Sequence, residues 1–298
     1  MAKAKIVAFC FVLLMVGFWA HTPAIVEPHS LPPAIDTGFI SLTKNPLAKP
    51  LQGLSAQVGK FTVDGLIQYT LLLQPNDGMP VSGWPVIIFN HGFHPEPHNN
   101  GRRTLDGVTD RPGDYYRQVP QTLARHGFLV VVPDYRGHND SSGAEFTLQE
   151  SSPRWYVRDV LGLIEALKRD ARANMDHLFM LGHSMGAEVT LYAAAALGDQ
   201  LKGASIWSVY VPTVAKTTPQ ITAMEASSQF EQNFSPINIH HAKDDASTAF
   251  EGSLMIASKL KQLGKTGKLY SYLSANHLFT GDNLQLAIKR DIAFFRRI

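Results

Sequence analysis

Short apolar runs alternate with amphipathic stretches through most of this chain. Runs of four or five mostly apolar residues are typical of strands buried on both faces of a sheet. Such strands are predicted at residues 86–89, 128–132, 177–181, 204–207, 237–240 and 269–273. Stretches with apolar residues at helical spacing predict helices at residues 115–126, 153–169, 187–196, 252–263 and 283–297. The order of elements is therefore strand, then helix, repeated toward the C-terminus.

This alternation predicts the fold class and its boundaries. Strands that alternate with helices imply an α/β domain with a mostly parallel central sheet and helices on both faces. We expect that domain over residues 58–298, beginning with a hairpin whose turn is Asp64-Gly65. Residues 25–57 are rich in proline and serine and predict an extended lead-in. Residues 208–235 lack a clear pattern, and we expect a small cap there.

The most informative motif is Gly182-His183-Ser184-Met185-Gly186, between a predicted strand and a predicted helix. A Gly-x-Ser-x-Gly at that junction is a nucleophile elbow, where the serine takes strained dihedral angles and its neighbours must lack bulk. The serine hydroxyl then stands at a helix N-terminus, which favours developing negative charge. The pentapeptide alone is a weak signal. Its setting predicts Ser184 as the nucleophile.

A serine hydroxyl needs a base to take its proton and a carboxylate to orient that base. On this architecture the expected chain order is serine, acid, histidine. His277 follows the last predicted strand and is the predicted base, since no histidine lies downstream of it. Asp244 and Asp245 follow the strand before it. We prefer Asp245 as the acid and keep Asp244, which is typical of a turn carboxylate, as the alternative.

An acyl-transfer site also needs two N–H donors for the oxyanion. One is predicted to be the backbone N–H of Met185, directly after the nucleophile. The other is predicted to be the N–H of Phe93, in the loop Asn90-His91-Gly92-Phe93 after a strand. Asp134 and Arg136 follow another strand, and an Asp-Arg pair there is expected to pin the rim of the site.

Composition narrows the function classes. The chain has 298 residues, 45% of them hydrophobic, and a formal net charge of +2. So small and dispersed a charge gives no basis for binding nucleic acid. His91, His94 and His98 lie in a proline-rich loop rather than on one helix face, so we expect no metal. The predicted chemistry needs no cofactor.

The N-terminus has the pattern of a targeting segment. Lys3 and Lys5 precede an apolar run from Ile6 to Ala20. This layout predicts a signal peptide over residues 1–24 and export to the periplasm or the medium, because a membrane span needs about 20 apolar residues. An uncleaved anchor, with membrane association through residues 6–20, is the alternative. The single cysteine, Cys10, lies in this run, so the mature chain would contain no disulfide and no thiol nucleophile.

Taken together, these motifs resemble the α/β-hydrolase superfamily over residues 58–298. The chain looks most similar to the branch of prolyl-oligopeptidase catalytic domains and dienelactone-hydrolase-like esterases. The resemblance implies Asp245 as the acid, because family members have His-Gly-x-x-Asp where this chain has His241-Ala242-Lys243-Asp244-Asp245. Residues 25–57 do not have the pattern of a propeller domain, and the elbow carries Ser184 where dienelactone hydrolases carry cysteine.

The resulting expectation is a serine hydrolase that cleaves carboxylic esters of small molecules through an acyl-enzyme. Cleavage of short peptides or amides is the alternative within the same chemistry. A non-catalytic binding protein on a hydrolase scaffold is the alternative from another class, because a fold alone does not determine function.

Overall fold

The structure, a computed structural model, describes residues 39–43, 51–94, 97, 118–148, 152–210 and 235–298. The signal-peptide segment, the expected cap apart from residues 208–210 and 235, and His98 lie outside these ranges. In the described part of the chain no helix is long and apolar enough to cross a membrane.

The strands are β1 Phe39–Thr43, β2 Leu54–Val63, β3 Leu66–Pro75, β4 Trp84–Asn90, β5 Leu129–Asp134, β6 Ala173–His183, β7 Leu201–Trp207, β8 Ile237–Ala242 and β9 Gly267–Tyr272. The α-helices are α2 Gln118–Arg125, α3 Ser152–Leu167, α4 Met185–Leu197, α7 Phe250–Gln262 and α8 Gly281–Phe295. Short 3₁₀ turns are present at η3 Ala144–Phe146 and η4 Gly198–Gln200. Every strand and helix predicted from periodicity corresponds to one of these elements.

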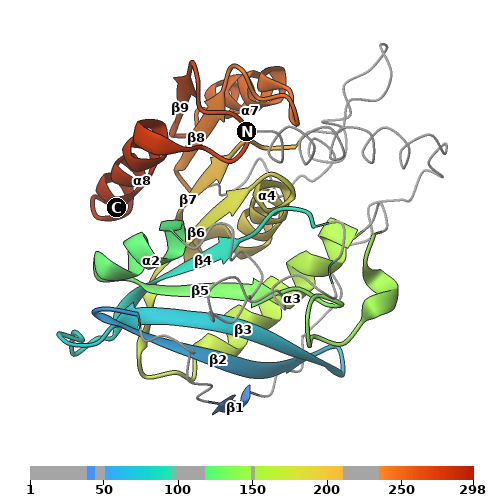
Figure 1. The fold of residues 1–298 in the computed structure, drawn as a ribbon, viewed down its shortest axis with the longest axis vertical. Coiled ribbons are helices and arrows are strands. Elements are labelled where there is room, and N and C mark those ends of the chain that lie inside the picture. Colours follow the sequence, from blue (N-terminus) through green and yellow to red (C-terminus); the bar gives the residue numbers. More distant parts are fainter. Residues whose placement is uncertain (1–38, 44–50, 95–96, 98–117, 149–151, 211–234) are drawn as a thin grey trace, which may run out of the picture.

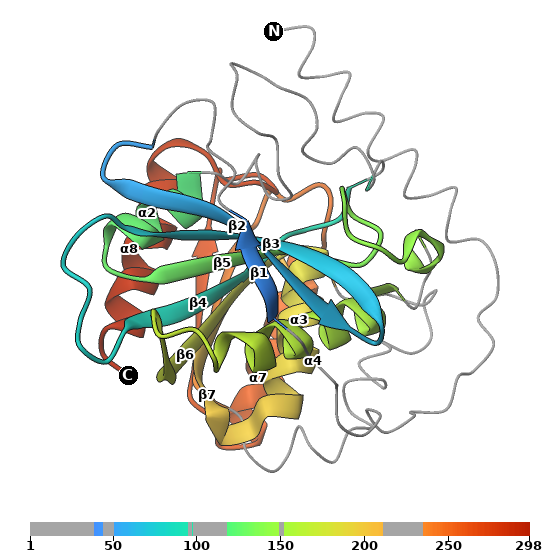
Figure 2. The same cartoon turned by 90° about the horizontal axis from the view of Figure 1, so that it is seen from below.

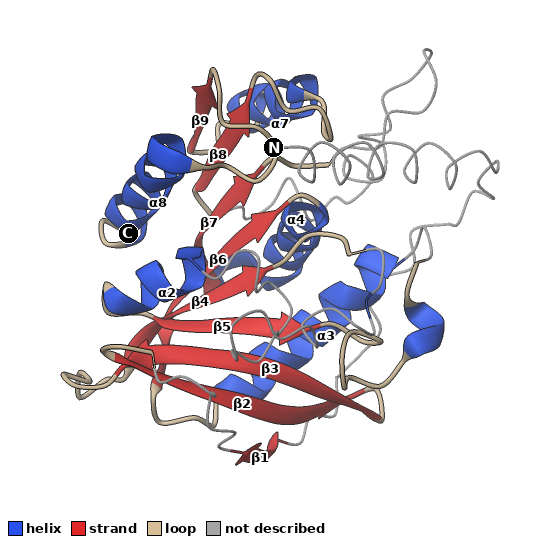
Figure 3. Cartoon of the chain, viewed as in Figure 1, coloured by secondary structure: helices blue, strands red, loops and turns tan. Residues whose placement is uncertain are grey.

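One sheet joins the strands in the order β1-β2-β3-β5-β4-β6-β7-β8-β9 (Figures 1 and 3). From β5 through β4 to β9 all neighbouring strands are parallel, whereas β1, β2, β3 and β5 pair antiparallel. The sequence prediction of a mostly parallel sheet is confirmed. The stretch expected to be an extended lead-in contains β1 and the first residues of β2.

The hairpin turn at Asp64-Gly65 forms as predicted. Val63 pairs with Leu66, so the loop has two residues. Both have positive φ, 54° for Asp64 and 75° for Gly65. That backbone matches the right-handed twist of the two strands that it joins.

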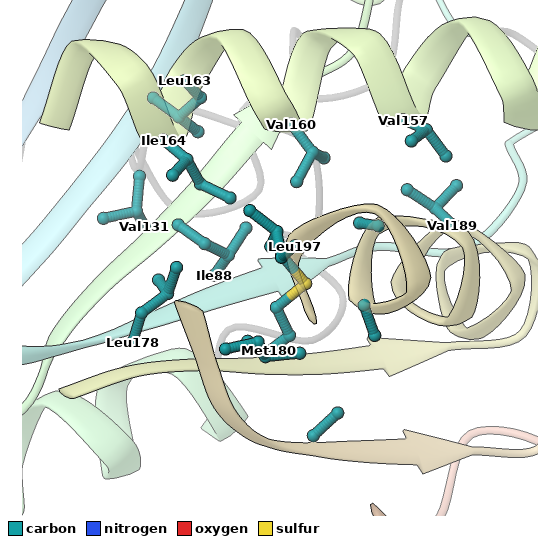
Figure 4. Packing of buried hydrophobic residues seen from close by; sticks show 14 of the residues in the cluster. Ile88, Val131, Val157, Val160, Leu163, Ile164, Leu178, Met180, Val189 and Leu197 are labelled. Carbon is teal, nitrogen blue, oxygen red and sulfur yellow. The ribbon is translucent and has the colours of Figure 1, made fainter. Parts of the chain in front are cut away.

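The helices cover the sheet on both faces, α2 and α8 on one and α3, α4 and α7 on the other (Figure 2). Because strand side chains alternate between faces, each buried strand contributes to two cores. In β4, Ile88 lies in the cluster beneath α3 and α4, and its neighbour Ile87 lies in the cluster beneath α2 and α8. In the first cluster, Val160 and Leu163 of α3 pack onto side chains of the strands (Figure 4).

Both cores hold the parallel strands in place, so that the C-terminal ends of β4, β6, β7, β8 and β9 open at the same edge of the sheet. This edge is where parallel α/β sheets bind ligands. Each residue that the sequence predicts for the site lies in a loop or helix that begins at that edge.

Candidate active site

Ser184 occupies the junction of β6 and α4 in a conformation that L-residues rarely adopt. Its φ is 56° and its ψ is −122°. A Cβ at Gly182 would overlap the carbonyl oxygen of Gly186 and the hydroxyl of Thr190. The backbone N–H of Ser184 donates to the carbonyl of Trp207 at 2.9 Å, which ties the turn to β7. Close packing therefore over-determines the strained serine, as at a nucleophile elbow.

The loop after β4 lies directly against this elbow. A Cβ at Gly186 would overlap the carbonyl oxygens of Asn90 and His91. The side chain of Asn90 also donates to Thr190 Oγ1 at 2.8 Å, and that hydroxyl donates to the carbonyl of Gly186 at 2.8 Å. Only glycine at position 186 permits this approach, which carries the chain from β4 toward Phe93 beside the start of α4.

The two predicted oxyanion donors lie on the two sides of that contact. Met185 is the first residue of α4, where a backbone N–H has no carbonyl partner within its own helix. Phe93 lies three residues beyond the end of β4, with its side chain packed against the core under α3 and α4. The structure thus brings both predicted segments to the elbow.

His277 and Asp245 are brought together by the loops after β9 and β8. Nδ1 of His277 lies 2.8 Å from Oδ2 of Asp245, whose side chain is fully buried. The neighbouring carboxylate, that of Asp244, has different partners. Oδ1 of Asp244 accepts the backbone N–H groups of Ala275 at 3.2 Å and Asn276 at 3.4 Å. Asp244 therefore holds the loop that carries His277, while Asp245 contacts the imidazole.

Asp245 is held ionised by its own turn. Its Oδ1 accepts the backbone N–H groups of Ser247 at 2.8 Å and Thr248 at 3.0 Å, and its Oδ2 accepts the hydroxyl of Thr248 at 2.8 Å. Nε2 of His241 lies 3.4 Å from the same Oδ2. Burial opposes ionisation, but hydrogen bonds from His241, His277 and Thr248 outweigh it and lower the pKa of Asp245 below its usual range.

A second set of contacts holds the backbone of His277. The carbonyl oxygen of His277 lies 2.7 Å from Nε2 of His183 and 3.2 Å from the hydroxyl of Ser208. The rings of His183 and His277 meet edge to face, with centroids 4.6 Å apart. Burial lowers the pKa of His183 to about 3, so its imidazole is neutral near pH 7. These contacts join the elbow strand to the loop of His277.

The loop after β4 is held by an aromatic cluster. The ring of His91 lies 4.3 Å from that of Tyr135 and 5.2 Å from that of His138, and Tyr135 stacks on Tyr156 at 4.6 Å. Nδ1 of His91 lies 2.9 Å from the carbonyl of Gly92. Burial lowers the pKa of His91 to about 4, so this histidine is a neutral packing residue. Among the described residues no group of three or more His, Cys, Asp or Glu could hold a metal ion.

The expected pairing of Asp134 with Arg136 is wrong. Arg136 is 1% exposed and its guanidinium binds Asp159 of α3 through Nε at 3.0 Å and Nη2 at 2.8 Å. Nη2 also reaches Asp64 of the β2–β3 turn at 2.9 Å. Asp134 instead accepts the side-chain amide of Asn139 at 3.2 Å. Arg136 still anchors the loop after β5, but to α3 and the hairpin.

Sequence reasoning missed three polar residues around His277 and Asp245, namely His183, Ser208 and Thr248. His183 and Ser208 contact the backbone of His277, which lies 94 and 69 residues after them in the chain. No local pattern encodes such a contact. The contact of Thr248 with Asp245 is predictable from sequence, because a carboxylate often accepts hydrogen bonds from a residue three positions later in a local turn.

Comparison with known proteins gives a partial match to a family and a likeness in fold. A model of the serine aminopeptidase family S33 matches residues 105–222, a stretch that includes Ser184 but neither Asp245 nor His277. The monoglyceride lipase of Rattus norvegicus is 31% identical over 88 residues, which are 30% of this chain and 28% of the lipase. The chain therefore matches less than a third of that relative's length.

Solved structures resemble most of the chain. An acylaminoacyl peptidase of Pyrococcus horikoshii has a TM-score of 0.62 and 20% identity, over 83% of this chain and 42% of the peptidase. The esterase Est22 in complex with p-nitrophenol has a TM-score of 0.60 and 15% identity, over 82% of this chain and 81% of the esterase. This chain has the α/β-hydrolase fold, and its resemblance to the serine hydrolases of that fold is confirmed.

Proposed function

We propose that this protein is a serine hydrolase that cleaves carboxylic esters through an acyl-enzyme, with Ser184, His277 and Asp245 as its catalytic triad. The observation that carries the proposal is the 2.8 Å contact between Nδ1 of His277 and Oδ2 of Asp245, on loops at the same edge of the sheet as the strained Ser184. A histidine oriented by a buried carboxylate beside a serine at an elbow is the geometry of nucleophilic acyl transfer.

In the first half of the reaction the hydroxyl of Ser184 attacks the acyl carbon, and Nε2 of His277 takes its proton. Nδ1–H of His277 donates to Asp245, which fixes the tautomer that leaves Nε2 free to act as a base. The carboxylate stays ionised and stabilises the imidazolium, consistent with its lowered pKa. His277 then returns the proton to the leaving alcohol, and the acyl group remains on Ser184.

The oxyanion of each tetrahedral intermediate accepts the backbone N–H groups of Met185 and Phe93. The support for this assignment is that the β4 loop and the first turn of α4 are packed together through Gly186 and Asn90. Donors fixed before the reaction need no reorganisation as charge develops. In the second half, water deprotonated by His277 attacks the acyl-enzyme and releases the acid. Neither a metal nor another cofactor enters this scheme.

Peptide or amide cleavage is the second candidate, since the matched family is named for serine aminopeptidases and one similar structure is an acylaminoacyl peptidase. The same residues would serve it. The two candidates differ in the leaving group that His277 must protonate. Monoglyceride lipase and Est22 favour an ester.

We also propose that residues 1–24 direct export of the chain and are removed. The support is the layout of basic residues followed by the apolar run from Ile6 to Ala20. The N-terminal sequence of the mature protein recovered after expression with residues 1–24 present tests this directly. A mature chain that still begins at Met1 in the membrane fraction would favour the anchor instead.

The function itself is tested by comparing wild type with Ser184→Ala on p-nitrophenyl butyrate and on a dipeptide p-nitroanilide. We expect ester turnover that falls by about 10³-fold or more in the variant, because the acyl-enzyme can no longer form. Turnover of the anilide alone would favour the peptidase. If neither substrate is cleaved and a fluorophosphonate probe leaves Ser184 unlabelled in folded protein, the chain is a binding protein on a hydrolase scaffold.

A further inference from the structure

The carbonyl of His277 is the meeting point of two side chains from other strands. His183 precedes the nucleophile at the end of β6, and Ser208 directly follows β7. Both contact this oxygen, at 2.7 Å for Nε2 of His183 and 3.2 Å for the hydroxyl of Ser208. A carbonyl oxygen only accepts hydrogen bonds, so Nε2 of His183 carries a proton and donates it.

The charge state of His183 agrees with that role. Its side chain is buried, and burial lowers its pKa to about 3. A neutral imidazole with its proton on Nε2 has a definite tautomer, set by the bond that it makes. His183 therefore does not compete with His277 for the proton of the nucleophile.

The loop that carries His277 depends on such contacts. Asn276 and Phe279, which bracket the segment, both have positive φ, 48° and 53°, in the region that side chains disfavour. No helix or strand fixes the segment between β9 and α8. A backbone in this conformation persists only where the surroundings hold it. Asp244, His183 and Ser208 bind its main chain from other loops and strands, and Asn283 of α8 donates to the carbonyl of Ser274 at 3.0 Å.

We propose that His183 is a positioning residue for the reaction, which sets the height and tilt of the His277 imidazole above Ser184 through its bond to the His277 carbonyl. This inference rests on the proposed function, because it gives the residue between Gly182 and the nucleophile a task in that same site. The edge-to-face contact of the two rings, at 4.6 Å, supports the ring from the side while the hydrogen bond holds the backbone. In this proposal His183 acts through His277 and takes no part in the proton transfers.

The kinetic test compares His183→Leu, which removes the donor and keeps the bulk, with His183→Gln, whose amide N–H reaches about as far as Nε2. His177→Gln is the matched control, since His177 is exposed and lies on the same strand, six residues before His183. With p-nitrophenyl butyrate we expect kcat to fall about 10–100-fold in His183→Leu with KM within about threefold, because a small displacement of the base slows the chemical step. His183→Gln should recover most of that loss. Equal losses in both His183 variants would overturn the proposal.

A second readout is independent of turnover. In protein with ¹⁵N-labelled imidazoles, the Nδ1–H signal of His277 reports its bond to Asp245. We expect this signal to shift or broaden in His183→Leu and to be unchanged in His177→Gln. If it is unchanged in His183→Leu, the positioning role is wrong whether or not the enzyme is active. If it responds while wild type and Ser184→Ala are equally inactive, the positioning contact stands and the proposed function fails.

Discussion

Two adjacent aspartates serve the same loop through different contacts. Asp245 points its buried carboxylate at the imidazole of His277, and Asp244 points its partly solvated carboxylate at the backbone N–H groups of Ala275 and Asn276. The first contact requires a negative charge, because it stabilises an imidazolium during the reaction. The second requires only an oxygen acceptor.

This difference predicts losses of activity of very different size for the same Asp→Asn substitution at the two positions. Asp245→Asn should lower kcat by about 10³–10⁴-fold, because an amide carries no charge and can stabilise the wrong tautomer of His277. Asp244→Asn should retain activity within about tenfold, because its amide oxygen still accepts the two N–H groups. Both are measured as kcat/KM for p-nitrophenyl butyrate at neutral pH, beside the melting temperature of each variant. A larger loss in Asp244→Asn, with its fold intact, would reverse the assignment of the acid.

At the scale of elements, a buried carboxylate of α8 binds two strands of the sheet. Asp291 of α8 accepts Trp207 Nε1 at 2.7 Å and Ser205 Oγ at 2.8 Å, both from β7, and lies 3.0 Å from Nε2 of His240 on β8. All four side chains are almost wholly buried, and Nδ1 of His240 is paired with the hydroxyl of Tyr272 at 2.7 Å. This Asp-His pair has the composition of a catalytic dyad but is closed to solvent, so it is structural.

Removal of that carboxylate should strongly destabilise the folded protein. Asp291→Ala leaves Nε2 of His240 and the hydroxyl of Ser205 without this acceptor in the core, and it removes the shorter of the two hydrogen bonds of the Trp207 indole N–H. We therefore expect a loss of about 3 kcal/mol or more in the free energy of unfolding. Asp282→Ala, an exposed acidic residue in the first turn of the same helix, is the control and should cost about 1 kcal/mol or less. Guanidinium chloride unfolding measures both. Equal losses would mean that the network contributes no more than the helix dipole.

At the scale of the whole molecule, a buried neutral histidine links stability to pH. His91 packs against Tyr135 and His138 of the loop after β5, and both of these rings contact Tyr156 of α3. Its pKa in the folded chain is about 4, below the value of about 6.5 expected when the chain is unfolded. Between these values the unfolded chain binds a proton that the folded chain does not. Acid therefore favours unfolding.

The contribution of His91 is small at pH 7 and grows to a loss of about 2 kcal/mol at pH 5. In His91→Asn this part of the pH dependence is absent, while an amide N–H remains near the carbonyl of Gly92. We expect the free energy of unfolding to fall by about 2 kcal/mol more in wild type than in the variant between pH 7 and pH 5. Parallel curves for the two proteins would show that His91 is protonated in the folded state at pH 5.

The sequence predicts where the strands and helices lie better than it predicts which strands are neighbours in the sheet. Apolar runs locate β4 and β5 because both strands are buried on two faces, but nothing in them indicates that β5 lies between β3 and β4. The first residues of β6 are missed because Asn174 and Asp176 interrupt the apolar pattern. Ser184 and His277 follow from motif and order, whereas the partners of Arg136 and His183 depend on packing between distant segments.

The alternation of side chains across the sheet has a consequence for how this chain tolerates change. The cluster beneath α3, α4 and α7 and the cluster beneath α2 and α8 share no residue. Substitutions at sites that share no partner act on stability additively. Mutations on opposite sides of the sheet that are more than about 7–10 Å apart should therefore change the free energy of unfolding additively. A cavity on one side can be filled only by a larger side chain from that same side.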